Sequence, residues 1–184
     1  PKINQLINLF HKNKISTFVV TNAQYPEAIK KLKPVTQLYI SLDAPNPELL
    51  KKIDKPIFKD YWKRLLKSLK IMSKKKHRTC IRLTMIKSLN MIEPENYAKL
   101  IMIARPDFIE VKAYMHVGSS RKNLERKNMP LHTEIKAFAR KLVKFLPDYE
   151  IADEHKHSRV ILLADKKFKK KSKWNTKIDF KGLF

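Results

Sequence analysis

The sequence is poor in cysteine and glycine. Cys80 is the single cysteine among 184 residues, so the chain can form no internal disulfide and no cysteine-based zinc or iron–sulfur site. We expect Cys80 to be a small core residue of an apolar strand. The only two glycines, Gly118 and Gly182, lie far apart, which excludes the glycine-rich phosphate loops of Rossmann and P-loop proteins.

Long apolar runs are missing as well. Stretches such as residues 160–164 are too short to span a bilayer, and the first residues lack the charged-then-apolar pattern of a signal peptide. We therefore expect an intracellular protein, located in the cytoplasm and without a membrane partner.

Positive charge is what the sequence has in excess. Lys and Arg number 41 against 17 acidic residues, a net charge of +24, while 43% apolar residues suffice for a folded core. Such a surface repels itself unless a polyanion neutralises it, which favours nucleic acid or an anionic membrane surface. A compositional bias towards lysine is the alternative. Basic clusters lie at residues 74–78, at 121–127 and at 166–173. Each alone is typical of a solvated face, and together they favour RNA.

Apolar periodicity predicts alternating helices and strands. Helical patterns cover residues 2–14, 26–32, a segment from Trp62 to Met72, 94–103 and 131–145, whereas strand patterns cover 16–20, 37–42, 79–86, 107–115, 149–152 and 159–164. Pro45 and Pro47 are interpreted as breakers. This alternation predicts an α/β protein with parallel strands, either an open doubly wound sheet or part of a β/α barrel. Residues 165–184 are predicted to form a basic tail.

Polar residues gather where the predicted strands end, which is where parallel α/β folds bind ligands. These positions are Thr21, Asn22, Ser41, Asp43, Arg82, Lys87, Asn90, Lys112 and His116. Hydroxyl, amide and carboxylate groups of this kind suit a ribose or an amino-acid head group.

Two groups of polar residues allow more than one interpretation. Arg82 and Lys112 lie inside apolar strands, so they face a ligand, face solvent, or are neutralised by a neighbour, as Glu110 could do for Lys112. Asp153, His155 and His157 would share one face of a strand and could bind a metal, but a polar turn is the favoured interpretation and we predict no metal site.

Several segments resemble one enzyme family. Residues 18–26 (FVVTNAQYP), 35–44 (VTQLYISLDA), 82–90 (RLTMIKSLN) and 108–112 (FIEVK) are similar to the 4-demethylwyosine synthases, radical S-adenosylmethionine enzymes that make the tRNA base wybutosine. Residues 55–60 and 149–158 look like the eukaryotic form. The resemblance follows the order of the whole chain.

The resemblance implies a partial β/α barrel of the radical S-adenosylmethionine type. Residues 1–164 would be its later βα units, and the complete enzyme would bind a 4Fe–4S cluster, S-adenosylmethionine and, in a further domain, flavin. It would join N1-methylguanosine-37 of phenylalanine tRNA to carbons of pyruvate; its electron donor is unknown. Carried over by motif, the S-adenosylmethionine contacts are Thr21, Asn22, Ser41 and Asp43; the catalytic residues are Lys112, Arg82 and Lys87; and the substrate or tRNA contacts are Asn90, His116, Arg121, Lys122, Arg126 and Lys127.

The sequence also departs from the family. The Cys-x-x-x-Cys-x-x-Cys loop that binds the cluster is absent, as is the Gly-Glu-Pro stretch, and Ser88 stands where many relatives have glycine. We therefore expect a truncated or degenerate copy that performs no radical chemistry by itself. Two alternatives stay open. One is a non-catalytic RNA-binding module, and the other is a different β/α-barrel enzyme with Lys112 as a Schiff-base lysine.

Overall fold

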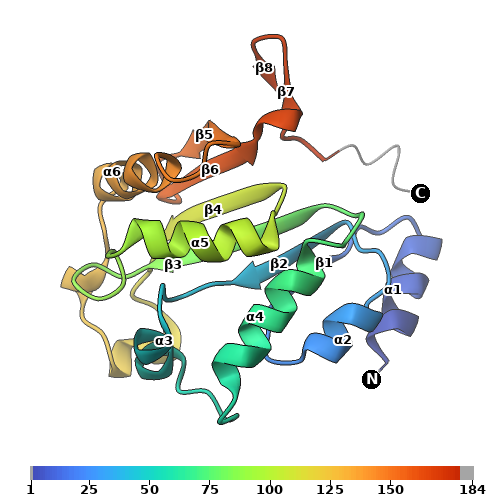
Figure 1. The fold of residues 1–184 in the computed structure, drawn as a ribbon, viewed down its shortest axis with the longest axis horizontal. Helices are drawn as coiled ribbons and strands as arrows, with labels where there is room; N and C mark the ends of the chain where they lie inside the picture. Colours follow the sequence, from blue (N-terminus) through green and yellow to red (C-terminus); the bar gives the residue numbers. More distant parts are fainter. Residues whose placement is uncertain (1, 179–184) are drawn as a thin grey trace.

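The computed structural model of the chain describes residues 2–178, and its centre is a six-stranded sheet in the order β1-β2-β3-β4-β6-β5 (Figure 1). The strands are β1 (Phe18–Thr21), β2 (Gln37–Ser41), β3 (Thr79–Met85), β4 (Phe108–Ala113), β5 (Tyr149–His155) and β6 (Val160–Asp165). β1 to β4 pair in parallel, and β6 is antiparallel to both β4 and β5. The α/β class predicted from the sequence is confirmed.

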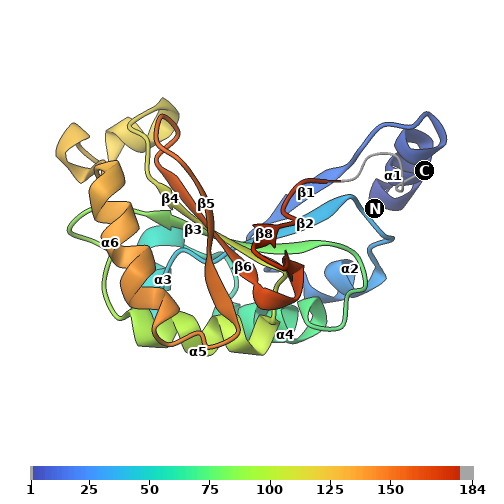
Figure 2. The same cartoon turned by 90° about the horizontal axis from the view of Figure 1, so that it is seen from above.

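The helices are α1 (Ile3–Lys12), α2 (Pro26–Lys31), α3 (Pro47–Asp54), α4 (Tyr61–Met72), α5 (Pro94–Ala104) and α6 (His132–Val143). Figure 2 shows α2, α4 and α5 along one face of the sheet. None of the helices in residues 2–178 has the length and apolar content needed to cross a bilayer.

Strand alternation explains why this face carries the core. Ile40, Ile81 and Ile109 are register neighbours in β2, β3 and β4, and all three are fully buried on the helix side. The predicted apolar stripe of α4 supplies Leu65 and Leu69, which are equally inaccessible. Successive side chains of a strand point to opposite faces. The residues directly before and after each isoleucine in its strand therefore lie on the other side of the sheet. We call that side the open face.

Helix α3 was not predicted, because Pro45 and Pro47 were interpreted as breakers. The structure shows that Pro47 opens the helix, where its missing N–H costs nothing. Asn46 caps this helix, since its side-chain oxygen accepts a hydrogen bond from the Leu49 N–H at 2.9 Å. The Asn46-Pro47 pair therefore marks the start of a helix.

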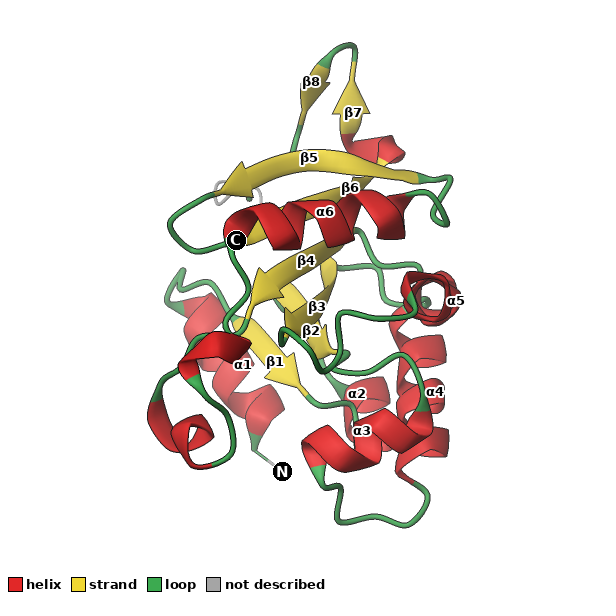
Figure 3. Cartoon of the chain, turned by 90° about the vertical axis from the view of Figure 1, so that its left-hand side faces the viewer, coloured by secondary structure: helices red, strands yellow, loops and turns green. Residues whose placement is uncertain are grey.

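The segment after β6 covers the amino end of the open face. It contains a short 3₁₀ turn, η3 (Lys166–Phe168), and a small hairpin of β7 (Lys169–Lys170) and β8 (Lys173–Trp174) (Figure 3). Phe168 and Trp174 pack against Cys80 and Phe108. Cys80 is fully buried there, as expected, and burial raises the pKa of its thiol. The boundary predicted after residue 164 stays a prediction, and residues 179–184 of the predicted tail, with Gly182, lie outside the described residues.

Candidate functional site

The carboxyl half of the open face carries a row of polar side chains. Ser41, Arg82 and Glu110 are register neighbours on β2, β3 and β4, and Thr84 and Lys112 form the next such pair towards the strand ends. The strand alternation that buries the isoleucines places these residues together on the open face. The sequence reasoning singled out Ser41, Arg82 and Lys112, and it missed Tyr39 and Thr84, which the same two-residue spacing identifies.

An ion pair lies in the middle of this row. Arg82 Nε donates to Glu110 Oε2 at 2.9 Å, and the Tyr39 hydroxyl donates to Glu110 Oε1 at 3.2 Å. The Arg82 guanidinium also lies 4.5 Å from the centre of the Tyr39 ring. Burial and the Glu110 charge raise the pKa of the Tyr39 hydroxyl, which keeps it a donor. The alternative that Glu110 neutralises Lys112 is wrong, because Glu110 pairs with Arg82 and no ion pair joins it to Lys112 in the described structure.

Lys112 remains without a partner when Arg82 and Glu110 pair with each other. Its side chain is half-buried at the edge of the open face, and its amine makes no hydrogen bond or ion pair with any residue from 2 to 178. A half-buried amine without a carboxylate partner can bind an anion or attack a carbonyl carbon.

Asp43 follows the end of β2 in a poorly solvated position. Burial, together with the nearby Asp54 charge, raises the pKa of its carboxyl to about 7, although Thr84 donates hydrogen bonds to it. A carboxyl group that changes charge near neutral pH can accept or donate a proton in a ligand-binding site.

Asn90 holds the ends of β2 and β3 together. It is fully buried; its amide donates to the Asp43 and Thr84 carbonyls at 2.9 and 2.8 Å, and its side-chain oxygen accepts from the Ile86 N–H at 2.6 Å. Its polar atoms are therefore used inside the fold. Contact with a substrate, predicted from the sequence, stays a prediction for Asn90.

The turn after β1 presents Thr21 and Asn22. The Thr21 hydroxyl oxygen accepts from the Ala23 N–H at 3.1 Å, and the Asn22 side-chain oxygen accepts from the Gln24 N–H at 3.3 Å. These bonds fix the turn and leave the Thr21 hydroxyl proton and the Asn22 amide available as donors. Next to them, the buried Gln24 side-chain oxygen has no partner among the described residues.

Lys87 begins the turn that follows β3. Its amine lies 2.7 Å from Glu134 Oε1, and this hydrogen bond holds the pKa of Glu134 below its usual range. Glu134 also accepts from the Leu131 N–H at 2.7 Å, which caps α6. Ser88 has φ 64°, a left-handed conformation that favours glycine. Relatives with glycine at this position would adopt it without strain.

The basic loop after β4 lies at the same end of the sheet as Lys112. Its two 3₁₀ turns are η1 (Gly118–Lys122) and η2 (Arg126–Asn128). The Tyr114 hydroxyl contacts His116 Nδ1 at 3.2 Å, and Arg121 Nε donates to the His116 carbonyl at 3.2 Å. Lys122, Arg126 and Lys127 are exposed, although Lys127 pairs with Glu125 at 3.0 Å. This loop therefore adds cations to the rim of the open face.

In the candidate metal trio, Asp153 and His155 lie in β5, and His157 lies in the turn that follows. His155 Nδ1 lies 2.8 Å from the Ser158 hydroxyl, and the His155 and His157 rings are 6.0 Å apart. No group of three or more potential ligands gathers anywhere in the described part of the chain.

Parallel strands with helices on one face and polar groups at the strand ends are the arrangement of a partial β/α barrel. The comparisons with known proteins identify it further. The family model "Radical SAM superfamily" matches residues 1–101, and a model described as "Wyosine base formation" matches residues 103–165. The chain belongs to the radical SAM superfamily.

The curated relatives are tRNA 4-demethylwyosine synthases that depend on S-adenosyl-L-methionine. The mouse protein TYW1 is 51% identical over 181 residues, which are 98% of this chain and 25% of that protein. The human protein is 49% identical over the same share of each chain, and the rice protein is 49% identical over 183 residues, 28% of its length. The chain thus spans about a quarter of the length of these relatives.

Solved structures of the same family share the fold. A structure of TYW1 with a lysine-pyruvate adduct bound has a TM-score of 0.83 and 38% identity, and archaeal TYW1 has a TM-score of 0.76 and 35% identity. Each match covers 94% of this chain and 55% of the other. Coproporphyrinogen III oxidase from Escherichia coli, at 16% identity and a TM-score of 0.54, shows the fold alone. The expected radical SAM type of partial barrel is confirmed.

Radical SAM membership implies S-adenosylmethionine and an iron–sulfur cluster. The residues present do not fit the cluster, because Cys80 is the only cysteine and is buried against Phe108 and Trp174. The hydroxyl, amide and carboxyl groups at the ends of β1 and β2 do suit a ribose and an amino-acid head group.

Proposed function

We propose that this chain is part of a tRNA 4-demethylwyosine synthase. Such an enzyme would join N1-methylguanosine-37 of phenylalanine tRNA to carbons of pyruvate with the help of S-adenosylmethionine. The observation that carries the proposal is the 51% identity to the mouse synthase over 181 residues. The wyosine-formation match supports it further, because residues 103–165 include Lys112 and the basic loop after β4.

Thr21, Asn22, Ser41 and Asp43 would contact S-adenosylmethionine. Their strands β1 and β2 are neighbours, so the four side chains follow adjacent strand ends. The free donors of Thr21 and Asn22 suit ribose hydroxyls or a carboxylate, and the Asp43 carboxyl suits an amine. The cluster would have to be bound by residues outside this chain, as would any flavin.

Lys112, Arg82 and Lys87 would act on the substrate side. Lys112 offers an unpaired amine, and the Arg82–Glu110 pair fixes a guanidinium two residues further from the strand end. Lys87 would help to position the turn after β3 through its ion pair with Glu134 of α6. We assign Asn90 a positioning role as well as its predicted place near the substrate, because it ties Asp43 to Thr84.

His116, Arg121, Lys122, Arg126 and Lys127 would contact tRNA. They lie on or beside the loop that follows β4, and most of their charge is exposed. Lysine and arginine side chains in such a position bind phosphates without reading sequence. A cytoplasmic location agrees with this substrate and remains part of the proposal.

The test is an anaerobic reaction of a protein that contains this chain together with the cluster-binding residues. It is given phenylalanine tRNA carrying N1-methylguanosine-37, pyruvate, S-adenosylmethionine and a reductant. Digested tRNA is then analysed by mass spectrometry. We expect 4-demethylwyosine to appear as N1-methylguanosine disappears. Unchanged N1-methylguanosine, in a preparation that contains the cluster and binds the tRNA, would refute the proposal.

Two further measurements separate the alternatives. The 184-residue chain incubated alone with iron and sulfide should show no stable 4Fe–4S absorbance, since it has one cysteine. Borohydride reduction with pyruvate, followed by peptide mapping, tests whether Lys112 forms a Schiff base. A label on Lys112 in a protein that binds no cluster would favour a different β/α-barrel enzyme.

A further inference from the structure

A basic groove runs along the outer wall of the sheet, on the face opposite Lys112. It consists of two pockets of about 290 and 460 Å³ between α2 and α4, which share Glu27 and Lys67 as lining residues. Figure 1 shows the two helices side by side. We call this feature the α2–α4 groove. Its cationic lining residues include Lys30, Lys63, Arg64, Lys67, Lys70 and Lys74.

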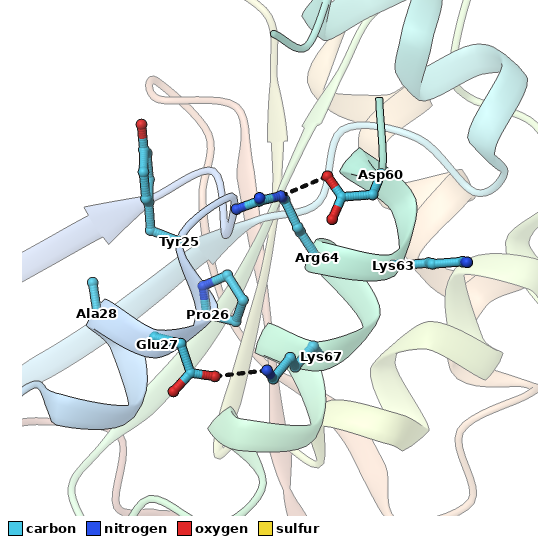
Figure 4. Close-up of a pocket in the computed structure, with 8 residues that line it drawn as sticks. All are labelled: Tyr25, Pro26, Glu27, Ala28, Asp60, Lys63, Arg64 and Lys67. Carbon is cyan, nitrogen blue, oxygen red and sulfur yellow. Dashed lines mark hydrogen bonds and ion pairs between the residues drawn. The ribbon is translucent and has the colours of Figure 1, made fainter. Parts of the chain in front are cut away.

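The positive charge of the groove is poorly neutralised. Among the described lining residues only Glu27 and Asp60 are acidic, and both are already used: Lys67 lies 2.6 Å from Glu27, and Arg64 lies 2.7 Å from Asp60 (Figure 4). The amines of Lys30, Lys63, Lys70 and Lys74 make no ion pair or hydrogen bond with any described residue. Cations that line a concave surface attract a polyanion more strongly than the same charges on a convex one. Figure 4 shows that the Lys63 side chain is directed away from α2.

The cations of α4 are arranged in a line. Lys63, Lys67 and Lys70 are three or four residues apart in α4 and therefore lie on one side of the helix, about 5–6 Å from one to the next. Lys74 follows in the turn after α4. This spacing allows neighbouring side chains to reach successive phosphates of one strand. A point anion such as free phosphate would need only one or two of them.

Aromatic side chains stand at one end of the groove. Tyr25 is 60% exposed and makes an edge contact with Phe58 at 5.3 Å between ring centres, and the Arg64 guanidinium lies 3.8 Å from the Phe58 ring centre. Figure 4 shows Tyr25 to the left of Arg64 at this end. Tyr25 follows the turn of Thr21 and Asn22, so the aromatic end lies at the rim of the candidate active site. Exposed rings beside cations are the arrangement on which unpaired bases stack, and they distinguish an RNA strand from a lipid surface.

We propose that the α2–α4 groove binds a single-stranded stretch of the RNA substrate, with its phosphates on the lysines of α2 and α4 and a base on Tyr25. The inference rests on the proposed function, because the proposed function identifies the RNA substrate as tRNA. It adds a second RNA contact on the opposite side of the sheet from the basic loop after β4. The groove begins next to the turn after β1. One RNA strand can therefore pass from the candidate active site along the helix-covered face of the sheet.

The test measures binding of labelled phenylalanine tRNA transcript by fluorescence anisotropy over a range of salt concentrations. The groove variant carries K30Q, K63Q, K70Q and K74Q. The matched control removes the same charge from exposed lysines of other helices or their ends, with K52Q, K99Q, K141Q and K144Q. All eight side chains are exposed, so both variants should fold, which circular dichroism checks.

We expect the groove variant to bind at least tenfold more weakly at about 0.1 M salt and to lose about three units of the salt slope. The control should lose less than one unit. Equal losses in the two variants would overturn the inference, as would weakened binding to phosphatidylserine vesicles with tRNA binding unchanged.

Tyr25 is tested separately because a stacked base contributes no salt dependence. Tyr25→Ala should weaken binding about tenfold with the slope unchanged, and Tyr25→Phe should restore it. A Tyr25→Ala variant that binds like the parent removes the stacking part of the inference. Product formation is recorded with the same substitutions in a protein that also contains the cluster-binding residues and has its cluster. Absent 4-demethylwyosine with groove-dependent tRNA binding defeats the proposed function alone, and product formation with groove-independent binding defeats the groove alone.

Discussion

The two ends of the open face use their charged side chains in opposite ways. At the amino end Arg78 donates to Gln37 Oε1 at 2.6 Å and to the Thr176 carbonyl, and its guanidinium lies 3.8 Å from the Phe108 ring centre. At the carboxyl end the Lys112 amine has no partner in residues 2–178. A cation that is fully engaged stabilises the fold, whereas an unengaged one is available to a ligand.

The difference separates a stabilising end from a binding end within one sheet. The segment with Phe168 and Trp174 packs on the amino end, where it covers the cluster of Cys80, Phe108 and Ala164. Substitutions at the amino end should therefore act on stability and leave ligand binding per folded molecule unchanged. Asn90 lies at the binding end but is buried like a core residue. Substitution of Asn90 therefore tests whether a residue at the binding end can act on stability.

Phe108→Ala should have the largest effect on stability. Phe108 is 1% exposed and packs against Phe168, with ring centres 4.7 Å apart. We expect a loss of about 3–4 kcal/mol in the free energy of unfolding, from lost burial and the cavity left behind. Urea unfolding followed by circular dichroism measures it. Phe145→Ala, a truncation of a 47% exposed ring, should cost less than about 1 kcal/mol. Similar costs for both variants would contradict a packed amino end.

Asn90→Ala comes next, with an expected loss of about 2–3 kcal/mol. The substitution leaves the partly buried Asp43 and Thr84 carbonyls and the buried Ile86 N–H without their side-chain partner. The same unfolding measurement applies, and exposed Asn123→Ala serves as the control. If Asn90→Ala were as stable as the parent but bound substrate poorly, Asn90 would be a ligand contact and its structural role would be minor.

Asp43→Asn should stabilise the protein in a pH-dependent way. The folded carboxyl has a pKa raised to about 7, so it stays protonated at pH values where the unfolded chain, with a pKa of about 4, has already ionised. Stability therefore falls as pH rises from about 4 to about 7. Removing the charge should add about 2 kcal/mol at pH 8, discounted for the partial exposure of Asp43, and little at pH 4. Unfolding at the two pH values measures the gain. Exposed Asp148→Asn should show no such dependence, and an Asp43→Asn gain equal at both pH values would mean that Asp43 is ionised in the fold.

Much of this division could be predicted from the sequence. Strand periodicity located β1 to β4, and the strand-end rule then selected Ser41, Asp43 and Lys112 without knowledge of their contacts. The resemblance to the synthases added the radical SAM barrel, which periodicity alone left open against a doubly wound sheet.

Long-range pairing could not be predicted in this way. Arg82 and Glu110 are far apart in sequence, and only the register of β3 with β4 brings them together. From the sequence, Glu110 was therefore considered only as one of several possibilities for neutralising Lys112. The closure of the amino end was missed for a similar reason. Phe168 lies in a segment whose lysines predict a basic tail, and its packing on the cluster of Cys80, Phe108 and Ala164 depends on the tertiary fold.

Ser88→Gly should produce the smallest effect, and it acts at the binding end. Ser88 has φ 64°, which costs a residue with a Cβ about 1 kcal/mol, and glycine recovers part of that while losing more entropy on folding. We expect a net gain of about 0.5 kcal/mol, or roughly 1–2 °C in Tm. Scanning calorimetry can resolve it, with Ser119→Gly as a control that should be neutral or slightly destabilising. A matching rise in both variants would point to a general effect of glycine. An unchanged Tm in Ser88→Gly would mean that contacts of the serine offset its backbone strain. The turn that carries Lys87 would then be stabilised by its side chains, as the amino end is.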